Sequence, residues 1–299
     1  MDRKVLAHMA MLAFSFLVAG SYSLGGQISN LIDPVALMTV RFGLAAVMLG
    51  CFTIGTIRFE LAFARAPWRF LVLGGLLATF FALMFVALKS ATPLSTSAVF
   101  TLTPFLSALF GALILKQTPS PRVVLVLGLG CIGALWIIFE GNLSQFIALN
   151  LGKGEAFFFV GCVAYALYVP LSAKLNRGEP TAFSVFFATL AGFGLLLSLS
   201  APSIVSIEWI ALPSIVWLGL AYLTVGSTVL TFLLIQYAAL NMDSLNVMSY
   251  TFLTPGWVLL WEWALTSSLP TATTLVGVSI TIVVMIILFK LAREPQSQS

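Results

Sequence analysis

Residues 85–120 read FVALKSATPLSTSAVFTLTPFLSALFGALILKQTPS. Two apolar runs are joined here by the short polar hinge Ala87 to Ser90, and Pro104 stands mid-way along the second run. Each run has about the 20 residues that an α-helix needs to cross the hydrocarbon core of a bilayer. Because such runs recur along the whole chain, the sequence predicts a protein that crosses the membrane many times.

The composition supports the same fold class. Of 299 residues, 60% are hydrophobic and 8% are charged, whereas a soluble domain carries about 25% charged residues. A water-facing surface cannot be built from this composition, and a disordered chain would be polar and charge-rich. A membrane β-barrel would instead show short segments of alternating polarity. We therefore expect an all-α integral membrane protein.

Helix breaks and polar clusters divide the chain into ten expected membrane-spanning helices of about 20 residues each. We place them near 5–28, 34–57, 68–89, 92–115, 122–140, 154–175, 181–200, 209–239, 243–266 and 271–291. The eighth is long for one span, which predicts an interfacial turn at its start. Five prolines stand at or just before helix starts, where a missing backbone amide is harmless: Pro34, Pro67, Pro121, Pro180 and Pro270.

Positive charge predicts the orientation. Of the 14 Lys and Arg residues, Lys89 and Lys153 fall on one side of the predicted membrane, Arg41 lies within a span, and all others fall on the side of the N-terminus. Because cytoplasmic loops carry the excess of Lys and Arg, we expect both termini in the cytoplasm. The net charge of +4 then anchors the chain at the inner leaflet and is not a nucleic-acid surface.

An internal repeat divides the chain. The string Leu-Thr-Pro occurs at 102–104 and again at 253–255, mid-way along an apolar span each time. Each copy follows a short polar hinge and precedes a proline that opens the next span. This ordered series of matches predicts a duplication, with halves at 1–145 and 146–299.

Each half then holds five spans. Because five is odd, the second half enters the membrane from the opposite side, so the repeat is inverted about a pseudo-two-fold axis in the membrane plane. Secondary transporters use this architecture and bind substrate near the midplane between the halves. Duplicated halves also occur in channels, but no pore-lining ring or filter is legible in this sequence.

Three stretches resemble the EamA-type carriers of the drug/metabolite transporter (DMT) superfamily. They are Phe85 to Ser120, Val35 to Leu49 with Arg41, and Gly154 to Leu175 with the run Tyr165-Ala166-Leu167-Tyr168. Within the superfamily the chain is most similar to the YddG-like exporters of aromatic amino acids. It departs from the family pattern after the fourth span, where an acidic residue is common and this chain has Gln117; the second copy has Ser268. No role of that carboxylate can be transferred.

The resemblance implies ten helices in two inverted five-helix repeats, a central cavity, and a place in the bacterial inner (plasma) membrane. It also implies alternating access by rocking of helices about hinge prolines, for which we name Pro104, Pro255 and, inside the sixth span, Pro170. The expected partners are the lipid bilayer and a small-molecule substrate, with no cofactor. One chain supplies both halves, so a monomer suffices.

Two ionisable residues lie inside predicted spans at similar depth from the outer side, Arg41 and Glu262. Such groups are costly in a bilayer and are functional candidates, so together they are a candidate outer gate. The alternatives are structural. Arg41 would fix a helix interface or cap carbonyl groups, and Glu262, flanked by Trp261 and Trp263, would reach the outer interface beside an aromatic belt.

The scarcity of charge constrains the substrate. Phosphorylated substrates need several basic groups in the cavity, and a proton-driven carrier of cationic drugs usually needs a carboxylate in mid-span; the predicted spans offer neither. A neutral or zwitterionic substrate with an apolar or aromatic side chain fits, because helix dipoles, backbone and hydroxyl groups can bind its charged ends. We expect an exporter of amino acids, and export of other amphipathic metabolites or drugs is the alternative.

The candidate substrate-binding residues are polar, aromatic or polarisable side chains within the predicted spans. Tyr165 is favoured as a stacking surface for an aromatic ligand. Pro104 frees a carbonyl near Phe100 that protein, water or ligand must satisfy. The alternative for these residues is packing, or a hydroxyl bonded back to its own helix. The full set is Thr79, Phe80, Met84, Ser97, Thr101, Tyr165, Tyr168, Thr228, Phe232, Ser249 and Tyr250.

An enzyme is not expected, and no residue is assigned a catalytic role. The one histidine, His8, lies near the inner end of the first span, and Asp33 and Asp243 lie at span ends on opposite sides of the membrane. An intramembrane hydrolase would need a nucleophile beside a base, or paired aspartates. The three cysteines lie inside apolar stretches, which predicts neither a disulfide framework nor a metal site.

Overall fold

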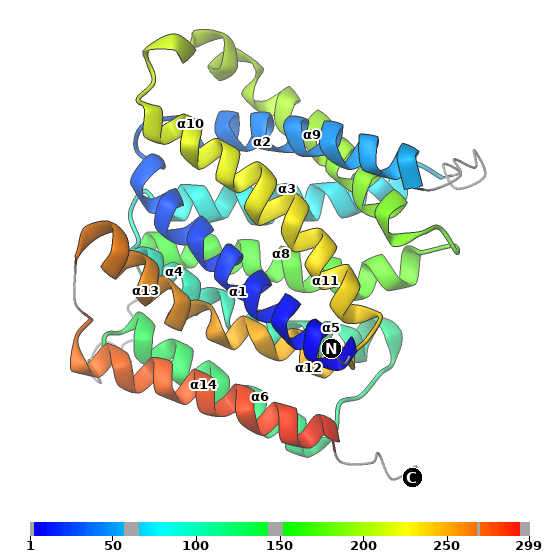
Figure 1. Ribbon diagram of the computed structural model, residues 1–299, viewed down its shortest axis with the longest axis vertical. Coiled ribbons are helices and arrows are strands. Elements are labelled where there is room, and N and C mark those ends of the chain that lie inside the picture. Colours follow the sequence, from blue (N-terminus) through cyan, green and yellow to red (C-terminus); the bar gives the residue numbers. More distant parts are fainter. Residues whose placement is uncertain (1–2, 57–65, 143–151, 268–269, 294–299) are drawn as a thin grey trace.

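The structure, a computed structural model, describes residues 3–56, 66–142, 152–267 and 270–293 (Figure 1). These residues fold into α-helices joined by short 3-10 and π segments. In chain order the elements are α1 (Arg3–Ile28), α2 (Pro34–Thr56), α3 (Trp68–Ala87), α4 (Pro93–Phe100), α5 (Thr103–Leu115), α6 (Pro121–Ile138), α8 (Lys153–Leu175), α9 (Thr181–Ser206), the 3-10 turn η2 (Trp209–Ala211), α10 (Ser214–Ala221), the π-helix η3 (Tyr222–Leu230), α11 (Thr231–Ala239), α12 (Ser244–Ser249), the 3-10 turn η4 (Tyr250–Leu253), α13 (Thr254–Thr266) and α14 (Ala272–Arg293).

Nine helical segments within the described residues are long and apolar enough to cross a membrane. They coincide with nine of the ten predicted spans. The remaining predicted span, 243–266, is built from α12, η4 and α13 in succession. The turn predicted at the start of the eighth span is η2. The helices run side by side, with connections alternating between two ends of the bundle, and α1 begins at the end where α14 finishes (Figure 1).

Several helices begin where proline and a capping side chain coincide. Asp33 accepts a hydrogen bond from the amide of Ala36 as α2 begins at Pro34. Thr92 caps α4 ahead of Pro93, and Ser120 caps α6 in the same way. A side-chain oxygen satisfies an amide that the first turn leaves free, and proline has no amide to satisfy. The predicted starts at Pro34 and Pro121 are therefore confirmed.

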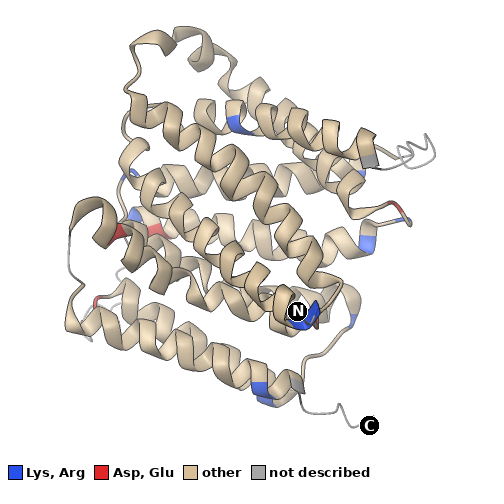
Figure 2. Cartoon of the chain, in the orientation of Figure 1, with Lys and Arg blue, Asp and Glu red and all other residues tan. Residues whose placement is uncertain are grey.

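The surface of the bundle suits lipid. Large aliphatic side chains are widely exposed on it, among them Val47, Leu125 and Leu199, which are 65%, 67% and 74% exposed. Charged residues lie mostly near helix ends, and the middle of the bundle is almost uncharged (Figure 2). Contiguous apolar surface of this kind is a liability in water and the norm in a bilayer. The chain is a multi-pass membrane protein.

Close helix contacts hold the interior together. α3 packs against α8 and α9, α2 against α9, and α6 against α14. At the crossing of α3 and α9, a Cβ added to Gly74 would overlap the carbonyl oxygen of Ala188 and lie 2.6 Å from the amide nitrogen of Gly192. Backbones approach this closely only where small residues meet, as is common between helices in membranes.

Two helix breaks stand at the repeated Leu-Thr-Pro strings. The first separates α4 from α5, and the second is the turn η4 between α12 and α13. The hydroxyl of Thr103 donates to the carbonyl oxygen of Phe100 at 2.7 Å, and that of Thr251 donates to Met248 at 2.7 Å. The carbonyl freed near Phe100 is therefore satisfied by the chain's own hydroxyl.

The helices that follow the two breaks also end alike. The residue that caps the end of α5 is Lys116, with φ 59°, and the residue that caps the end of α13 is Ser267, with φ 55°. Both residues adopt the left-handed conformation that closes many helices, and they stand at matching distances from Pro104 and Pro255. By contrast, α8 continues through Pro170 to Leu175.

A buried ion pair ties α3 to the connection between α8 and α9. Arg69 Nη1 lies 2.7 Å from Glu179 Oε1, and the two side chains are each 2% exposed. Arg69 also donates to the carbonyl oxygen of Leu175. Burial alone would raise the pKa of Glu179, but hydrogen bonds from the Arg177 amide and from Arg69, together with the charge of Arg69, hold it below the ordinary value of 4.5.

We expect Gly74→Ala to destabilise the bundle, because the new methyl group meets backbone that cannot move aside. Overpacking of this kind costs about 1–3 kcal/mol, which will lower the midpoint of thermal unfolding in detergent. Gly194→Ala is the matched control, since its Cβ has nothing within 4 Å and alanine favours the helix. Equal midpoints for the two variants would contradict the close crossing.

We expect Glu179→Gln to lower the free energy of unfolding by about 3 kcal/mol at pH 7, because it leaves a buried guanidinium without its partner. A carboxylate with a lowered folded pKa stabilises above its unfolded pKa and loses this contribution as the pH falls through the folded value. The gap between wild type and variant will therefore hold at about pH 6–8 and shrink below about pH 4. Glu208→Gln, at an exposed carboxylate, serves as control; a gap that is unchanged at low pH would refute the argument.

Candidate functional site

An aromatic cluster fills the centre of the bundle. Its rings are Tyr22 from α1, Phe80 from α3, Phe100 from α4, and Phe158 and Tyr165 from α8. Phe80 is the hub, with ring centroids 4.7 Å from Tyr165, 5.5 Å from Phe158 and 5.7 Å from Phe100. Tyr22 lies 6.1 Å from Phe100 and 6.0 Å from Phe158. These separations are typical of interacting aromatic pairs.

Both predicted tyrosines of the sixth span adjoin this cluster. The ring of Tyr165 lies at 34° to that of Phe80, and Tyr168 stacks on Tyr165 at 6.2 Å and 21°. Met84 is buried in the same core, one turn after Phe80 along α3. The cluster therefore brings together four of the predicted residues.

Arg41 lies beside the cluster, 1% exposed. Its Nε and Nη2 atoms donate to the hydroxyl oxygen of Thr228 at 3.0 and 2.9 Å. Nη2 is 3.4 Å from both oxygens of Ser227, and Nη1 is 3.8 Å from the sulfur of Met38. The guanidinium carbon lies 4.3 Å from the centre of the Phe81 ring, a cation–π geometry.

Thr228, whose hydroxyl oxygen accepts hydrogen bonds from Arg41, lies in the π-helix η3. Thr228 donates to the carbonyl oxygen of Leu223, five residues earlier, at 2.8 Å. Ser227 is hydrogen-bonded through its hydroxyl to Ser21 of α1. The π-helix is rare and is found frequently at functional sites. Here the π-helix η3 is bonded to α1 through Ser21 and to α2 through the guanidinium of Arg41.

The two residues of the predicted gate are separate in this conformation. Arg41 makes no ion pair with Glu262 among the described residues. Glu262 is half-buried on α13, and the indole of its neighbour Trp261 donates to the carbonyl oxygen of Phe16. Arg41 therefore spans the interface between α2 and η3, which is the structural alternative for this residue.

The predicted hydroxyl groups of the two broken spans are bonded to their own helices. Ser97 and Thr101 donate to the carbonyl oxygens of Leu94 and Ala98, both at 2.7 Å. Ser249 donates to Leu245 at 2.6 Å. In this conformation these hydroxyls stabilise helical turns beside the breaks.

Three further predicted residues lie away from the aromatic cluster. Thr79 is on the exposed face of α3, seven residues from the exposed Val72. Tyr250 belongs to a second cluster near the start of α1, where its hydroxyl pairs with His8 Nδ1 at 2.8 Å. Phe232 is half-buried on α11, one turn beyond Thr228.

Sequence reasoning missed three members of the site, Phe81, Phe100 and Phe158. Phenylalanine is common in this chain, with 25 copies, so composition did not distinguish these rings. The position of Phe100 directly before the helix break was the one available signal. Tyr22 was noticed in the first span, but its face could not be chosen from the sequence.

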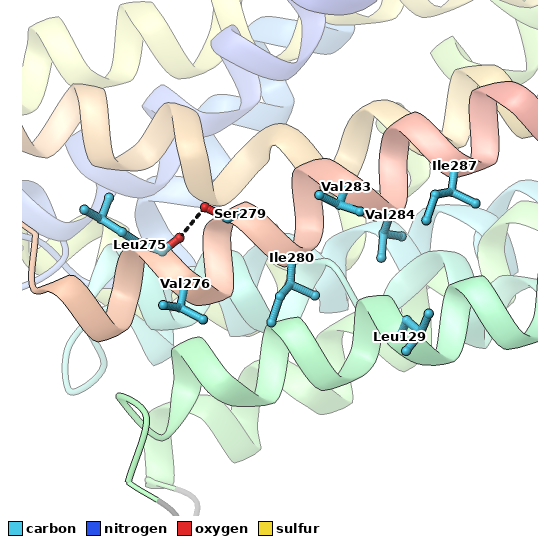
Figure 3. A pocket seen from close by; sticks show the side chains of 8 residues that line it. All are labelled: Leu129, Leu275, Val276, Ser279, Ile280, Val283, Val284 and Ile287. Atoms are coloured by element: carbon cyan, nitrogen blue, oxygen red, sulfur yellow. Dashed lines mark hydrogen bonds between the residues drawn. The ribbon is translucent and has the colours of Figure 1, made fainter.

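An apolar groove of about 450 Å³ lies elsewhere, along α14 beside α6 (Figure 3). Its walls are aliphatic, with Leu129 on α6 and Ile280 and Val284 on α14. The hydroxyl of Ser279, its polar member, donates to the carbonyl oxygen of Leu275 at 2.8 Å. The groove offers no free polar group to a zwitterion, and its chemistry suits an acyl chain.

Within the part of the chain that the structure describes, no three His, Cys, Asp or Glu side chains gather. The cysteines are dispersed, with Cys51 exposed and Cys162 buried.

A helical bundle whose long apolar helices expose large aliphatic side chains defines an integral membrane protein. The particular family follows from comparison: the EamA-like transporter family, of the DMT superfamily, matches residues 5–139 and again 152–290. The chain belongs to this family and is a transporter.

Relatives of similar length support the assignment. The uncharacterized transporter YyaM of Bacillus subtilis (strain 168) is 27% identical over 231 residues, which cover 76% of this chain and 75% of that protein. An uncharacterized transporter of Archaeoglobus fulgidus is 26% identical over 208 residues, 68% of each chain. A solved structure, described only as a crystal structure of a protein, superposes with a TM-score of 0.69 at 20% identity over 99% of both chains, which supports the fold.

Proposed function

We propose that this transporter exports small neutral or zwitterionic metabolites, most of all amino acids with aromatic side chains. The observation that carries the proposal is the buried aromatic cluster, which draws Tyr22, Phe80 and Phe100 from the first half of the chain and Phe158 and Tyr165 from the second. A site between the halves of a carrier is exposed to either side of the membrane in turn. Aromatic rings stack with an aromatic ligand at little cost in conformational entropy.

The charge at this site supports the same substrate class. One guanidinium, that of Arg41, adjoins the aromatic cluster. A phosphorylated substrate carries about two negative charges and calls for several basic groups, whereas a zwitterion needs one positive group and one polar or aromatic partner for its ammonium. The YddG-like subgroup of exporters is the corresponding part of the family.

We further propose ten spans in two inverted repeats, 1–145 and 146–299. The family matches the chain twice, once in each half. In the proposed repeat, α1, α2, α3 and α6 correspond to α8, α9, α11 and α14. The helix contacts fit this correspondence: α3 packs on α8 as α11 packs on α1, and the corresponding helices α2 and α9, like α6 and α14, pack on each other. The matching ends of α5 and α13 add to this support.

Alternating access would proceed by rocking at the two helix breaks, with Pro104 and Pro255 as hinges and Pro170 as a third. Arg41 and Glu262 are the proposed outer gate, closing when helices α2 and α13 approach. Both termini would lie in the cytoplasm of a bacterial cell, with the protein in the inner membrane. One chain holds both halves of the pathway, so a monomer is sufficient.

One observation favours the alternative substrate range of other amphipathic metabolites or drugs. Met84 is buried beside the aromatic cluster, and methionine adapts its shape to varied ligands. Competition by uncharged amphipathic dyes against labelled phenylalanine distinguishes the two ranges, because a selective amino-acid carrier will ignore the dyes.

The experiment that tests the proposal is uptake of labelled phenylalanine into proteoliposomes holding the purified protein. We expect uptake that equilibrates without an imposed proton gradient, because Arg41, the charged group beside the cluster, is bonded to hydroxyls, a carbonyl and a thioether and forms no ion pair within the described residues. Protein-free liposomes are the control. Uptake that appears only with a gradient would establish coupling, and failure to take up any labelled amino acid would refute amino-acid transport.

We expect Tyr165→Ala to reduce phenylalanine transport about tenfold while threonine transport falls less, because the stacking surface is lost. A stacked aromatic pair contributes about 0.5–1.5 kcal/mol beyond its buried area. Tyr237→Ala, on the exposed side of α11, should change neither rate. Equal loss for both amino acids would remove Tyr165 from substrate selection.

A further inference from the structure

Two arginines of this chain are almost fully buried, and they differ in what neutralises them. Arg69 and Arg41 are each 1% exposed. Arg69 meets the carboxylate of Glu179 at 2.7 Å, whereas Arg41 has no carboxylate partner within the described ranges. A buried charge without a counter-charge is costly, so buried guanidinium groups are normally paired. Arg41 is thus the exception that requires an explanation.

The neighbours of Arg41 leave part of its fork without a good acceptor. Thr228 accepts from Nε and Nη2, on one edge of the guanidinium. Nη1 has the thioether sulfur of Met38, at 3.8 Å, and a thioether is a weak acceptor. Arginine offers five N–H donors in a plane and pairs best with a carboxylate through two parallel bonds.

Two buried hydroxyl groups, on the elements α1 and η3, also lack a hydrogen-bond partner within the described structure. Tyr22, in the aromatic cluster, and Thr224, four residues before Thr228 in η3, are buried, and their hydroxyls have no hydrogen-bond partner among the described residues. An unsatisfied polar group in a dry interior costs free energy that a bound polar ligand removes. The guanidinium of Arg41 and the hydroxyls of Tyr22 and Thr224 together indicate a ligand that has a polar end.

We propose that Arg41 binds the carboxylate of the transported molecule while its apolar or aromatic side chain lies against the aromatic cluster. This rests on the proposed function and names the substrate class of the same site: small carboxylates with a ring or aliphatic chain, to the exclusion of amines that lack a carboxylate. Phe81 contacts both the guanidinium of Arg41 and the aromatic cluster. Its ring lies 4.3 Å from the guanidinium carbon and 4.9 Å from the ring of Phe80.

Access to Arg41 requires helix movement, because the guanidinium is buried under α2, α3 and η3. Alternating access supplies that movement. Thr228 is a positioning residue: its hydroxyl is held by the carbonyl oxygen of Leu223 and orients the fork of Arg41 from one edge. The other edge then faces an incoming carboxylate.

The test compares two ligands that differ in one charge, 3-phenylpropionate and its neutral amide, 3-phenylpropionamide. Each is titrated calorimetrically into the full-length protein in detergent, for the wild type and for Arg41→Gln, Arg41→Lys and Thr228→Val. Thr39→Val is the matched control, because Thr39 is buried on the same helix and its hydroxyl bonds the carbonyl oxygen of Val35 and the hydroxyl of Ser200 on α9.

In the wild type we expect the acid to bind at least about tenfold more tightly than the amide, as a charge-assisted hydrogen bond allows. The preference should vanish in Arg41→Gln, survive in part in Arg41→Lys, which keeps the charge without the fork, and fall in Thr228→Val. Thr39→Val should keep it. Monodisperse elution in detergent shows which variants are folded.

The inference is overturned if the wild type binds acid and amide equally or binds neither, a result that stands even if every variant misfolds. It is also overturned if Arg41→Gln keeps the preference. Its failure is separable from that of the proposed function. Phenylalanine uptake without an acid preference refutes the role of Arg41 alone, and an acid preference without amino-acid uptake refutes amino-acid export alone.

Discussion

Lipid supplies no hydrogen bonds, so each backbone group that a helix break frees inside this bundle must be satisfied by the protein itself. At the first break Thr103 donates to Phe100, and at the second Thr251 donates to Met248. The carbonyl of Phe100, which Pro104 leaves without a helical donor, thus has a partner in the chain, and at the second break the carbonyl oxygen of Thr251 accepts from the amide of Thr254. The same requirement turns Ser97 and Thr101 back onto their own helix, which leaves few hydroxyls free for a ligand.

The two buried arginines must also be satisfied by the protein, and they are satisfied in different ways. Arg69 lies at the start of α3, where Glu179 from the connection between α8 and α9 neutralises it and ties the three helices together. Arg41 lies well inside α2, where hydroxyls, a thioether and a ring take the place of a carboxylate. The first arrangement stabilises the bundle. The second keeps a positive charge beside an aromatic cluster, where one ligand carboxylate can complete it.

Much of the fold was predictable because a spanning helix is a local, composition-driven element. Apolar length, polar clusters and proline placed the helix starts within a few residues, and the repeated Leu-Thr-Pro string located both breaks. The site was predictable only in part. Phe80, Met84 and Tyr165 meet in one core, but Thr79 faces outward and Tyr250 pairs with His8. Every side of a membrane helix is apolar, so periodicity does not tell its lipid face from its interior face.

Composition and local backbone chemistry are enough to predict a multi-pass helical protein, the positions of its helix breaks and the few charges that enter the membrane, because each of these depends on residues that are close together in the chain. Tertiary structure alone decided which rings gather around Phe80, that α3 and α9 touch at Gly74, and that Arg41 meets Thr228 on a π-helix nearly 190 residues later in the chain. Those contacts join segments far apart in sequence, and their geometry is set by helix packing, which no local pattern encodes.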